Sequence, residues 1–567
     1  ANQIAWVDNS TLGNNFFSTG LTTADQMLDT PTLNYCTLNP LDEATQVTLA
    51  DGNLRYQLST NNYTAVRGTF GVSSGKWYWE MSTVAGMAVN TCYMGIANSA
   101  AALQVSGPAT DGTVYGYKSY TGDKFNTSNS SYGDAWNTNG RVIGIALDLD
   151  AGKIWWSRDN VWQASGDPAA GSGEAFSGLT GEWHPYVVFN DTGPNLLFNF
   201  GQTAFTYTPP SGFLALNTSN LPSPSIPDGS AHFQPTLYTG TGSSQAISQS
   251  GNSTFQPDFT WIKGRSGATE HALTDAVRGV TKELSTNDAG VEETVAQGLT
   301  TFGTAGFTVG TDGSYNTSSA TYVGWQWKAN GSGSSNTDGS ITSTVSANTT
   351  AGCSIVKFVG NGTSGATVGH GLGVAPKMLI LKDLGVAENW VIYHEAMGPT
   401  KFIYFTTIAA TTASNRWNNT APTSSVFSLG NETQVNASGR NYIVYAFAEI
   451  PGYSSFGSYT GNGSTDGPFV YAGGFKPAFV ILKRTNAVGG WFTYDSKRDP
   501  ENALTKVLQP DSSAAEVDSI DRLDFLSNGF KLRTSSANNN ASGGTFIYMA
   551  FAENPFGGDG VAPATAR

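Results

Sequence analysis

The sequence predicts an all-β protein in which one larger β-sandwich is followed by three small tandem sandwiches. The chain of 567 residues is poor in charged residues (13 %), rich in aromatic residues (12 %) and contains 67 glycines. Short runs rich in Val, Ile, Thr, Tyr and Trp stand between Gly, Asn, Ser and Asp turns, and long amphipathic helical patterns are absent. In addition, one pattern of about 100 residues is written three times, which predicts tandem modules.

The repeated pattern has landmarks whose spacing is kept in each copy. Each copy holds a proline, an apolar run and, six residues after the proline, a lysine: Lys263, Lys382 and Lys483. In each copy an aromatic residue lies eighteen or nineteen residues before the proline, at Tyr238, Phe358 or Tyr459, and a Gly-x-Gly follows the aromatic residue. A second apolar run closes each copy, over 322–327, 442–447 and 546–551. About 100 residues suffice for a small sandwich with its own core, so we expect globular modules and not a solenoid.

These landmarks and the composition divide the chain into eight expected segments. They are an N-terminal docking arm (1–46), a β-sandwich (47–216), a Pro/Ser linker (217–230), repeat 1 (231–330), a Gly/Ser/Thr linker (331–350), repeat 2 (351–452), repeat 3 (453–555) and a C-terminal tail (556–567). The arm either packs on the first sandwich or docks on another subunit or a larger particle. The 331–350 linker is either a flexible joint or an ordered crossover. Repeats 2 and 3 should be in rigid contact.

Charge and cysteine content exclude several classes of function. The net charge is −14, which would repel nucleic acid, and no Lys/Arg-rich patch offsets it. No run approaches the roughly 18 apolar residues of a membrane span, so we expect no membrane insertion. Cys36, Cys92 and Cys353 are too few for a disulfide framework. One bridge, Cys36–Cys92, is the candidate, but three free buried thiols are favoured.

The segment 47–216 carries a series of motifs in a fixed order. Residues 75–80 read GKWYWE, 93–97 read YMGIA, 141–150 read RVIGIALDLD and 198–201 read FNFG. In that order they resemble the SPRY domain, a concanavalin A-like β-sandwich, except that Arg141 stands where that family often has Asp. The resemblance implies a binding module without catalytic residues, whose partners contact loops at one end of the sandwich. Trp77, Trp79, Ile154 and Trp156 alternate as core positions would.

Other aromatic residues of this sandwich lie in or next to polar loops and are candidates for ligand binding. Aromatic rings beside Asp, Asn and Arg suit sugars, which offer apolar faces and hydroxyl groups. Ordinary half-buried loop aromatics are the competing interpretation. The candidate ligand-binding residues are Tyr117, Tyr120, Trp136, Trp155, Arg158, Asp159 and Trp162.

Two of the three repeats also share an acidic and a basic residue. Asp275 precedes Arg278 in repeat 1, and Asp495 precedes Arg498 in repeat 3. Repeat 2 has His394 and Met397 at these places. Such a pair could clamp a loop or bind a ligand carboxylate or hydroxyl. Because repeat 2 lacks the pair, a structural role is favoured for these four residues and for the three repeat lysines.

The sequence does not predict an enzyme. Asp148 and Asp150 lie on one face at a strand end, which hairpin chemistry explains better than a glycosidase pair. The five histidines never pair at metal-ligand spacing, and the glycine-rich stretches are not phosphate cradles. We therefore expect no catalytic residues, no metal and no cofactor.

The repeat landmarks, together with the linked sandwich, resemble repeat modules of bacteriophage virion proteins. This resemblance implies a structural protein of the virion surface, most simply a tail fibre or spike that recognises a host-surface glycan. A purely structural head-decoration or fibre-shaft protein is the alternative, and a polysaccharide depolymerase is the least favoured. The implied partners are other virion proteins, sister chains in a homo-oligomer such as a trimer, and the host glycan.

Overall fold

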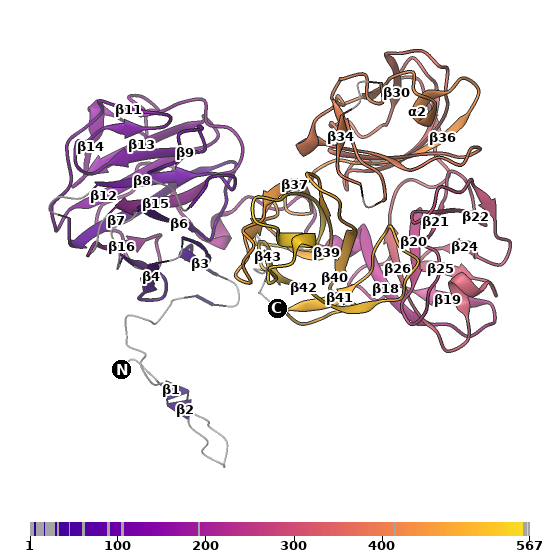
Figure 1. Ribbon diagram of the computed structural model, residues 1–567. Helices are drawn as coiled ribbons and strands as arrows, with labels where there is room; N and C mark the ends of the chain where they lie inside the picture. Colours follow the sequence, from indigo (N-terminus) through magenta and orange to yellow (C-terminus); the bar gives the residue numbers. More distant parts are fainter. Residues whose placement is uncertain are drawn as a thin grey trace. The chain divides into compact units, whose positions relative to one another are not determined.

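We describe a computed structural model of the chain (Figure 1), covering residues 5–6, 16–17, 29–30, 33–44, 46–58, 63–87, 91–103, 107–190, 193–406, 408–412, 415–558 and 564. Strands make up 45 % of the structure and helices 5 %, so the predicted all-β class is confirmed. The chain forms two compact units. Unit 1 comprises 1–223 and 557–563, and unit 2 comprises 224–556 and 564–567.

Unit 1 is a sandwich of two antiparallel sheets. The first sheet has the order β11-β10-β9-β8-β15-β6-β3, and the second has the order β14-β13-β12-β7-β16-β5-β4. The strands of the first sheet are β11 (Asn129–Ser130), β10 (Lys124–Phe125), β9 (Val114–Lys118), β8 (Thr91–Ala97), β15 (His184–Asn190), β6 (Tyr63–Gly68) and β3 (Leu38–Glu43). Those of the second are β14 (Val161–Trp162), β13 (Lys153–Arg158), β12 (Val142–Asp148), β7 (Lys76–Ala85), β16 (Asn195–Asn199), β5 (Arg55–Leu58) and β4 (Val47–Ala50). Trp77, Trp79, Ile154 and Trp156 are at most 1 % exposed, as their alternation predicts.

The sandwich begins earlier in the chain than the sequence suggested. Strand β3 pairs with β6, so residues 38–43 belong to the sandwich and not to the arm predicted over 1–46. Leu38 is fully buried, and this apolar contact ties the segment down. Strands β1 (Ala5–Trp6) and β2 (Phe16–Phe17) pair with each other; the rest of the arm before residue 29 lies outside the described residues. The three cysteines are free and buried, so Cys36 and Cys92 form no bridge.

Each repeat of unit 2 forms its own sandwich, and the main sheet has the same strand order in all three. Across each sheet, neighbouring strands are, in order, the strand with the landmark aromatic residue (the first strand), the strand of the closing run (the closing strand), the strand with the landmark lysine (the lysine strand) and a fourth strand. In repeat 1 these are β18 (Phe233–Thr239), β26 (Thr321–Trp327), β20 (Phe259–Gly264) and β21 (Ala272–Asp275). In repeat 2 they are β29 (Cys353–Val359), β36 (Asn441–Phe447), β31 (Met378–Asp383) and β32 (Val391–His394), and in repeat 3 they are β37 (Ser454–Thr460), β44 (Thr545–Pro555), β39 (Phe475–Arg484) and β40 (Trp491–Asp495).

A second sheet completes the sandwich of each repeat; it has fewer strands than the main sheet in repeats 1 and 2 and the same number in repeat 3. It contains β19 (Gln245–Ser248), β25 (Gly306–Val309) and β24 (Leu299–Gly303) in repeat 1, β30 (Ala366–Gly369) and β35 (Val426–Leu429) in repeat 2, and β38 (Phe469–Tyr471), β43 (Gly529–Leu532), β42 (Val517–Leu526) and β41 (Leu504–Val507) in repeat 3. The one-turn helices α1 (Gly313–Asn316), α2 (Thr433–Asn436) and α3 (Ala537–Asn540) precede the closing strands.

The segment 331–350 is part of repeat 2 and not a linker. It contributes β27 (Ser334–Asn336) and β28 (Ser343–Asn348), which extend the main sheet beside β29. Ser343 and Val345 are buried, and the Ser343 hydroxyl donates to the Gly369 carbonyl. Serine and threonine residues can therefore form buried strands when their hydroxyl groups have hydrogen-bond partners. A Gly/Ser/Thr-rich composition does not by itself distinguish such strands from a linker.

The three sandwiches pack around one shared core and not as a row of separate modules (Figure 1). Alternate residues of each closing strand face either the repeat's own core or its neighbours. Trp327, Phe447 and Phe551 meet in a triangle, with ring centroids 5.8–6.2 Å apart. One continuous apolar cluster holds buried residues of all three repeats. The closing runs are apolar almost throughout because they are buried on both faces.

Contacts between the repeats run in one direction and close into a ring. The lysine of each repeat donates to a backbone carbonyl of the preceding one: Lys382 to Ala289, Lys483 to Thr406 and Lys263 to Ser513. The residue eight places after each lysine does the same: Trp390 to Ser285, Trp491 to Tyr404 and His271 to Gln509. A head-to-tail contact made three times and closed on itself is a pseudo-three-fold ring. We call this arrangement the ring.

Candidate functional site

The structure divides the predicted sugar-binding residues into a buried and an accessible group. Tyr117, Trp136 and Trp155 are each 0 % exposed, so their assignment as binding residues was wrong. Tyr117 packs against Trp136 and Trp156 with ring centroids about 6 Å apart, and its hydroxyl donates to the Asp134 carbonyl at 2.5 Å. The flanking polar residues suggested loops, but the segments fold over the rings and bury them.

The remaining predicted residues lie near the protein surface, but most are engaged by their neighbours. Arg158 donates to the Asp134 carboxylate at 2.7 Å. Asp159 accepts from Arg141 at 2.7 Å and from the Val142 amide at 3.0 Å. Trp162 is half-buried, with its ring edge against Tyr78. Tyr120 is 54 % exposed, so it is the predicted aromatic residue that could stack on a ligand.

These residues lie at the end of the sandwich where β7 finishes. Strand β7 ends at Ala85, and the Thr83 hydroxyl close to that end accepts from the Arg141 amide. Residue Cys92, which follows at the start of β8, donates its amide to the Ser119 hydroxyl, next to Tyr120. Tyr120, the Arg158–Asp159 turn and the end of β7 therefore share one end of the sandwich, which we call the loop end.

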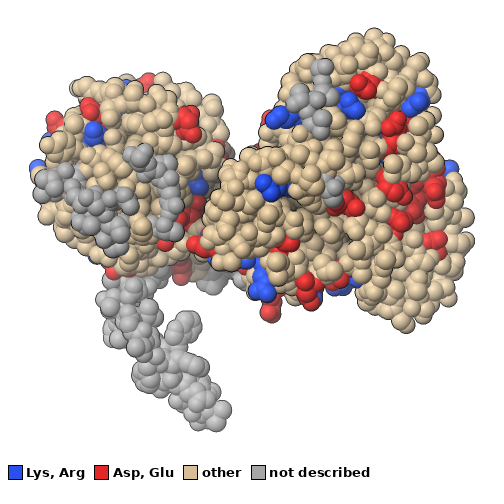
Figure 2. All heavy atoms as spheres, in the orientation of Figure 1, with Lys and Arg blue, Asp and Glu red and all other residues tan. Residues whose placement is uncertain are grey.

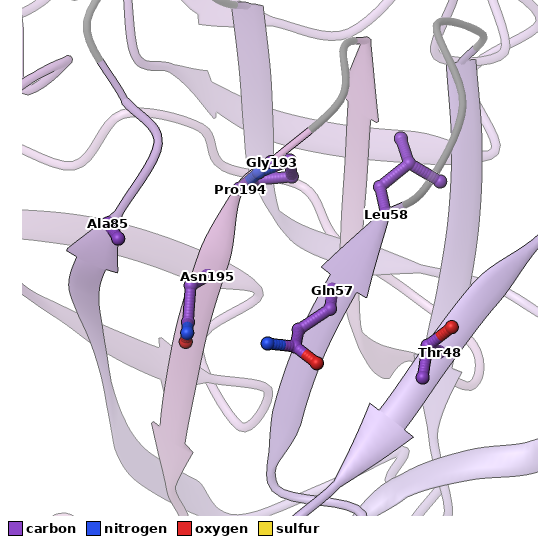
Figure 3. A pocket seen from close by; sticks show the side chains of 7 residues that line it. All are labelled: Thr48, Gln57, Leu58, Ala85, Gly193, Pro194 and Asn195. Carbon is purple, nitrogen blue, oxygen red and sulfur yellow. The ribbon is translucent and has the colours of Figure 1, made fainter.

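A cavity of about 310 Å³ opens at the loop end (Figure 3). Its lining is Thr48, Gln57, Leu58, Ala85, Gly193, Pro194 and Asn195. The Asn195 amide oxygen accepts from Arg55, whereas among the described residues the side chains of Gln57 and Thr48 have no hydrogen-bond partner. The cavity therefore offers amide and hydroxyl groups beside apolar surface, which suits a polar ligand with apolar faces. No motif predicts this cavity, because its lining comes from four strands and from the segment 193–194, which are brought together only by the fold.

The acidic residues of this sandwich are used structurally. Asp148 is buried, forms an ion pair with Lys76 at 3.0 Å and accepts from the Ala151 amide. Glu80 is 1 % exposed and accepts from Tyr78 and from two backbone amides. Across the described part of the chain, no three His, Cys, Asp or Glu side chains are grouped so that they could hold a metal ion. Within the same part, no helix is long and apolar enough to cross a membrane.

The repeat lysines lie between the repeats and not at the surface. Lys263, Lys382 and Lys483 are at most 1 % exposed. Burial lowers the pKa of each from 10.5 to about 8. Each ammonium group also donates within its own repeat, to Gly264, Glu388 and Gly489 carbonyls respectively. They lock one sandwich onto the next.

The Asp/Arg pairs also join neighbouring repeats. Asp275 pairs with Arg278 at 2.5 Å and accepts from the Tyr445 hydroxyl of repeat 2 at 3.0 Å. Asp495 pairs with Arg498 at 2.5 Å and accepts from the Trp325 indole of repeat 1 at 3.0 Å.

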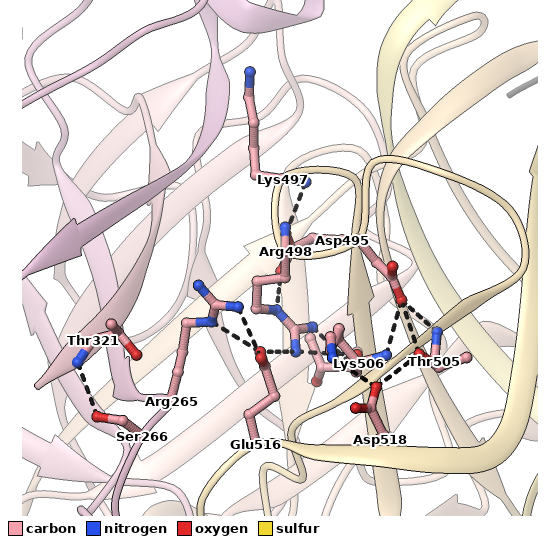
Figure 4. Close-up of polar contacts among 12 residues, drawn as sticks. Arg265, Ser266, Thr321, Asp495, Lys497, Arg498, Thr505, Lys506, Glu516 and Asp518 are labelled. Carbon is pink, nitrogen blue, oxygen red and sulfur yellow. Dashed lines mark hydrogen bonds and ion pairs between the residues drawn. The ribbon is translucent and has the colours of Figure 1, made fainter.

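The pair of repeat 3 belongs to a larger polar cluster (Figure 4). The Glu516 carboxylate lies between Arg498 at 3.1 Å and Arg265 of repeat 1 at 2.8 Å. Both arginines point toward it in the close-up. A carboxylate between two guanidinium groups from different repeats fixes how repeats 3 and 1 meet, so this cluster is structural and not a ligand site.

At the third junction a histidine replaces the pair. The His394 ring accepts from the Ala396 amide at Nδ1 and donates from Nε2 to the Tyr548 carbonyl of repeat 3 at 3.0 Å. Burial lowers the pKa of His394 to about 4. Repeat 2 therefore makes the same cyclic contact with a neutral side chain.

Each Gly-x-Gly motif is held by a buried asparagine that we did not identify from the sequence. Asn316, Asn436 and Asn540 are each 0 % exposed and lie six residues before the first aromatic residue of the closing strand. That equal offset in all three copies was a signal that could have revealed them. The first glycine of each motif has no room for a Cβ beside the backbone of 316–317, 436–437 or 540–541. The second has φ of 71–72°, which glycine adopts without strain.

Comparison with known families agrees with the two units. The model of the SPRY domain matches residues 76–203, so unit 1 contains an SPRY sandwich. The crystal structure of the SPRY domain of human HERC1 is similar at 17 % identity, over 30 % of this chain and 99 % of that chain, with a TM-score of 0.25. The model described as "Domain of unknown function (DUF7483)" matches residues 228–555, more than half of the chain. The chain belongs to that family.

Proposed function

We propose that the protein is a non-enzymatic binding protein of a bacteriophage virion surface, of the tail fibre or tail spike type, which recognises a host-surface glycan. The observation that carries the proposal is the loop end of the SPRY sandwich. There an exposed aromatic ring, Tyr120, and a cavity lined by the amide of Gln57 and the hydroxyl of Thr48, neither bonded to another described side chain, lie on a β scaffold. Binding sites held by a rigid scaffold lose little entropy when a ligand docks.

The phage assignment is supported by the repeat landmarks described above. On the face shown in Figure 2, basic side chains of the described residues are scattered and form no continuous patch, whereas several acidic side chains gather at the right of the view. Together with the net charge of −14, this favours a neutral or weakly charged ligand over nucleic acid.

A glycan array probed with the full chain tests the proposal. We expect binding to a subset of bacterial surface glycans, weakened at least tenfold by Tyr120→Ala or by Thr48→Ala with Gln57→Ala. The matched control is Thr203→Ala, an exposed threonine beyond the other end of β16. No binding to any glycan, together with binding to purified virion proteins, would favour the alternative of a head-decoration or fibre-shaft protein. Release of soluble products from host capsule would favour a depolymerase.

A homo-oligomer, such as a trimer, remains part of this proposal. The ring uses the inner faces of the three repeats within one chain, so association must use other surfaces. Sedimentation at micromolar concentration should show a species larger than a monomer. A monomer would count against a self-assembled fibre.

A further inference from the structure

The three Gly-x-Gly loops of unit 2 form a second surface with the features of a binding site. Their exposed tips are residues 241–244 in repeat 1, 361–364 in repeat 2 and 462–465 in repeat 3, and we call them the tip loops. The motif was evident in the sequence, but the function proposed above does not account for it.

Strand register places each tip loop at the end of its own main sheet that lies away from the triangle of Trp327, Phe447 and Phe551. The first strand and the closing strand of each repeat are antiparallel. The first strand therefore begins next to the end of the closing strand, at Trp327, Phe447 or Phe551 of the triangle, and ends next to the start of the closing strand. The pairs at the finishing end are Thr239 with Thr321, Val359 with Asn441 and Thr460 with Thr545. Because seven residues of strand span about 20 Å, the tip loops lie about that far from the triangle.

Both chain ends of unit 2 lie near the triangle end of the strands in their own repeats. Phe233 pairs with Trp327 where the chain enters the ring, and Phe475 pairs with Pro555 where it leaves. Gly229 approaches the Ala552 backbone closely there. The three tip loops are therefore equivalent by the pseudo-three-fold relation, and the chain enters and leaves unit 2 at the opposite ends of these strands.

Each tip loop is fixed in one conformation by its buried asparagine. The asparagine oxygen accepts from the first tip amide, at 2.7 Å for Thr241, 2.9 Å for Asn361 and 2.8 Å for Asn462. Its amide nitrogen donates to the third tip carbonyl, at 2.6 Å for Ser243, 2.9 Å for Thr363 and 2.7 Å for Ser464. Such loops lose little conformational entropy when a ligand binds.

The chemistry of the tips selects the kind of ligand. They read TGSS, NGTS and NGST, so they carry hydroxyl and amide groups and no charge. They also lack the Trp, Tyr and Arg anchors on which protein–protein interfaces depend. Three weak hydrogen-bonding contacts suit a ligand that repeats the same hydroxyl-rich unit many times.

We propose that the tip loops form a trivalent binding surface for a neutral, densely repeated polysaccharide. This inference rests on the proposed glycan recognition and assigns a second, avidity-based site to it. A single loop binds weakly, and simultaneous contact of three loops with a dense surface raises the apparent affinity by a factor of about 10² to 10⁴.

The test measures binding of the full chain to purified neutral O-antigen and capsule polysaccharides immobilised at low and high density. We expect binding at high density only. Ser244→Glu, Ser364→Glu and Thr465→Glu are exposed substitutions that place a solvated carboxylate on one tip each, and contact would require its desolvation. Each should lower the apparent affinity about tenfold, and the triple variant should lower it at least a hundredfold.

The matched control is Thr349→Glu, an exposed threonine that follows Asn348, at the end of β28 that pairs with Cys353 and away from the tip loop of its repeat. Equal binding by the triple variant and this control would overturn the inference. If Tyr120→Ala alone then abolished binding, the proposed glycan recognition would stand. Loss of all binding by the parent chain would overturn both. Envelopes whose glycans have been oxidised by periodate give a further comparison. If the parent chain still bound them and the triple variant did not, the partner would be a protein and the polysaccharide proposal would be overturned.

Discussion

The buried asparagines show how much one amide can hold in a β protein. The Asn436 side chain accepts from Asn361 and donates to the Thr363 and Gly430 carbonyls. Its equivalents in repeats 1 and 3 make the same bonds. An apolar replacement would remove the partner of the Asn361 amide, of the Thr363 carbonyl and of the buried Gly430 carbonyl.

Asn436→Ala should therefore lower the free energy of unfolding of unit 2 by about 2–3 kcal/mol, because each unpaired buried group costs about 1–3 kcal/mol. Urea unfolding followed by circular dichroism measures this change. The control is Asn330→Ala, at an exposed asparagine whose backbone alone is hydrogen-bonded. Equal stability of the two variants would contradict the stabilising role of the Asn436 side-chain hydrogen bonds.

The buried histidines make the ring sensitive to acid. Burial lowers the pKa of His394 from 6.5 to about 4 and that of His271 well below 6.5. The Nδ1 atom of His271 accepts a hydrogen bond from the Trp261 indole N–H. If Nδ1 were protonated, two hydrogen-bond donors would face each other at this contact. Between pH 6.5 and 4 the unfolded chain binds more protons than the folded one, so stability falls as the pH falls through this window.

For His394 alone, this linkage amounts to about 2 kcal/mol between pH 7.5 and 5. His394→Gln keeps an acceptor and a donor but does not titrate, so it should reduce the acid-induced loss by about that amount. Thermal unfolding of both proteins across the pH range measures the difference. Parallel stability curves for the parent and the variant would refute the assignment.

The paired strands and turns are common to the three repeats and produce the three-fold arrangement. The ion pairs at the junctions specify which repeat occupies each position in the ring. Asp495 and Arg498 are buried together with Trp325, whereas repeat 2 places His394 and Met397 at the same turn. Buried pairs are a weak source of stability but are costly to break, so they can discriminate between alternative partners. We infer that the two Asp/Arg junctions and the one His/Met junction keep the repeats in order.

Arg498→Met should destabilise unit 2 by about 3–5 kcal/mol, because Asp495 would remain buried and charged without its partner. Adding Asp495→His recreates the pair of residues found in repeat 2. The double variant should regain part of the loss, and a double-mutant cycle in urea measures the coupling. Additive effects of the two substitutions would show that the residues are independent.

Because the shared core joins all three repeats, unit 2 should unfold as one body. The Phe405 ring lies among Trp261, Trp390 and Trp491, one from each repeat, with ring centroids 5.0–6.1 Å away. Removing one repeat would expose the inner faces of the other two.

We expect the three closing strands to show the same opening free energy in native-state hydrogen exchange. Phe405→Ala should lower all three together by about 3–5 kcal/mol, the usual cost of removing a buried aromatic ring. Exchange is read by mass spectrometry of peptides from β26, β36 and β44. Three separate energies, or a drop confined to β36, would indicate independent modules.

The sequence by itself determined the all-β class, the SPRY sandwich and the threefold repetition of proline, lysine and closing run. These features depend on local alternation and on spacing along the chain, which a single sequence records. The tertiary structure decided that 331–350 is a strand pair, that Tyr117, Trp136 and Trp155 are buried, and that the repeats close into a ring. Those outcomes depend on which surfaces meet in three dimensions, and the partner is often a backbone carbonyl or an apolar face, which carries no signature in the sequence.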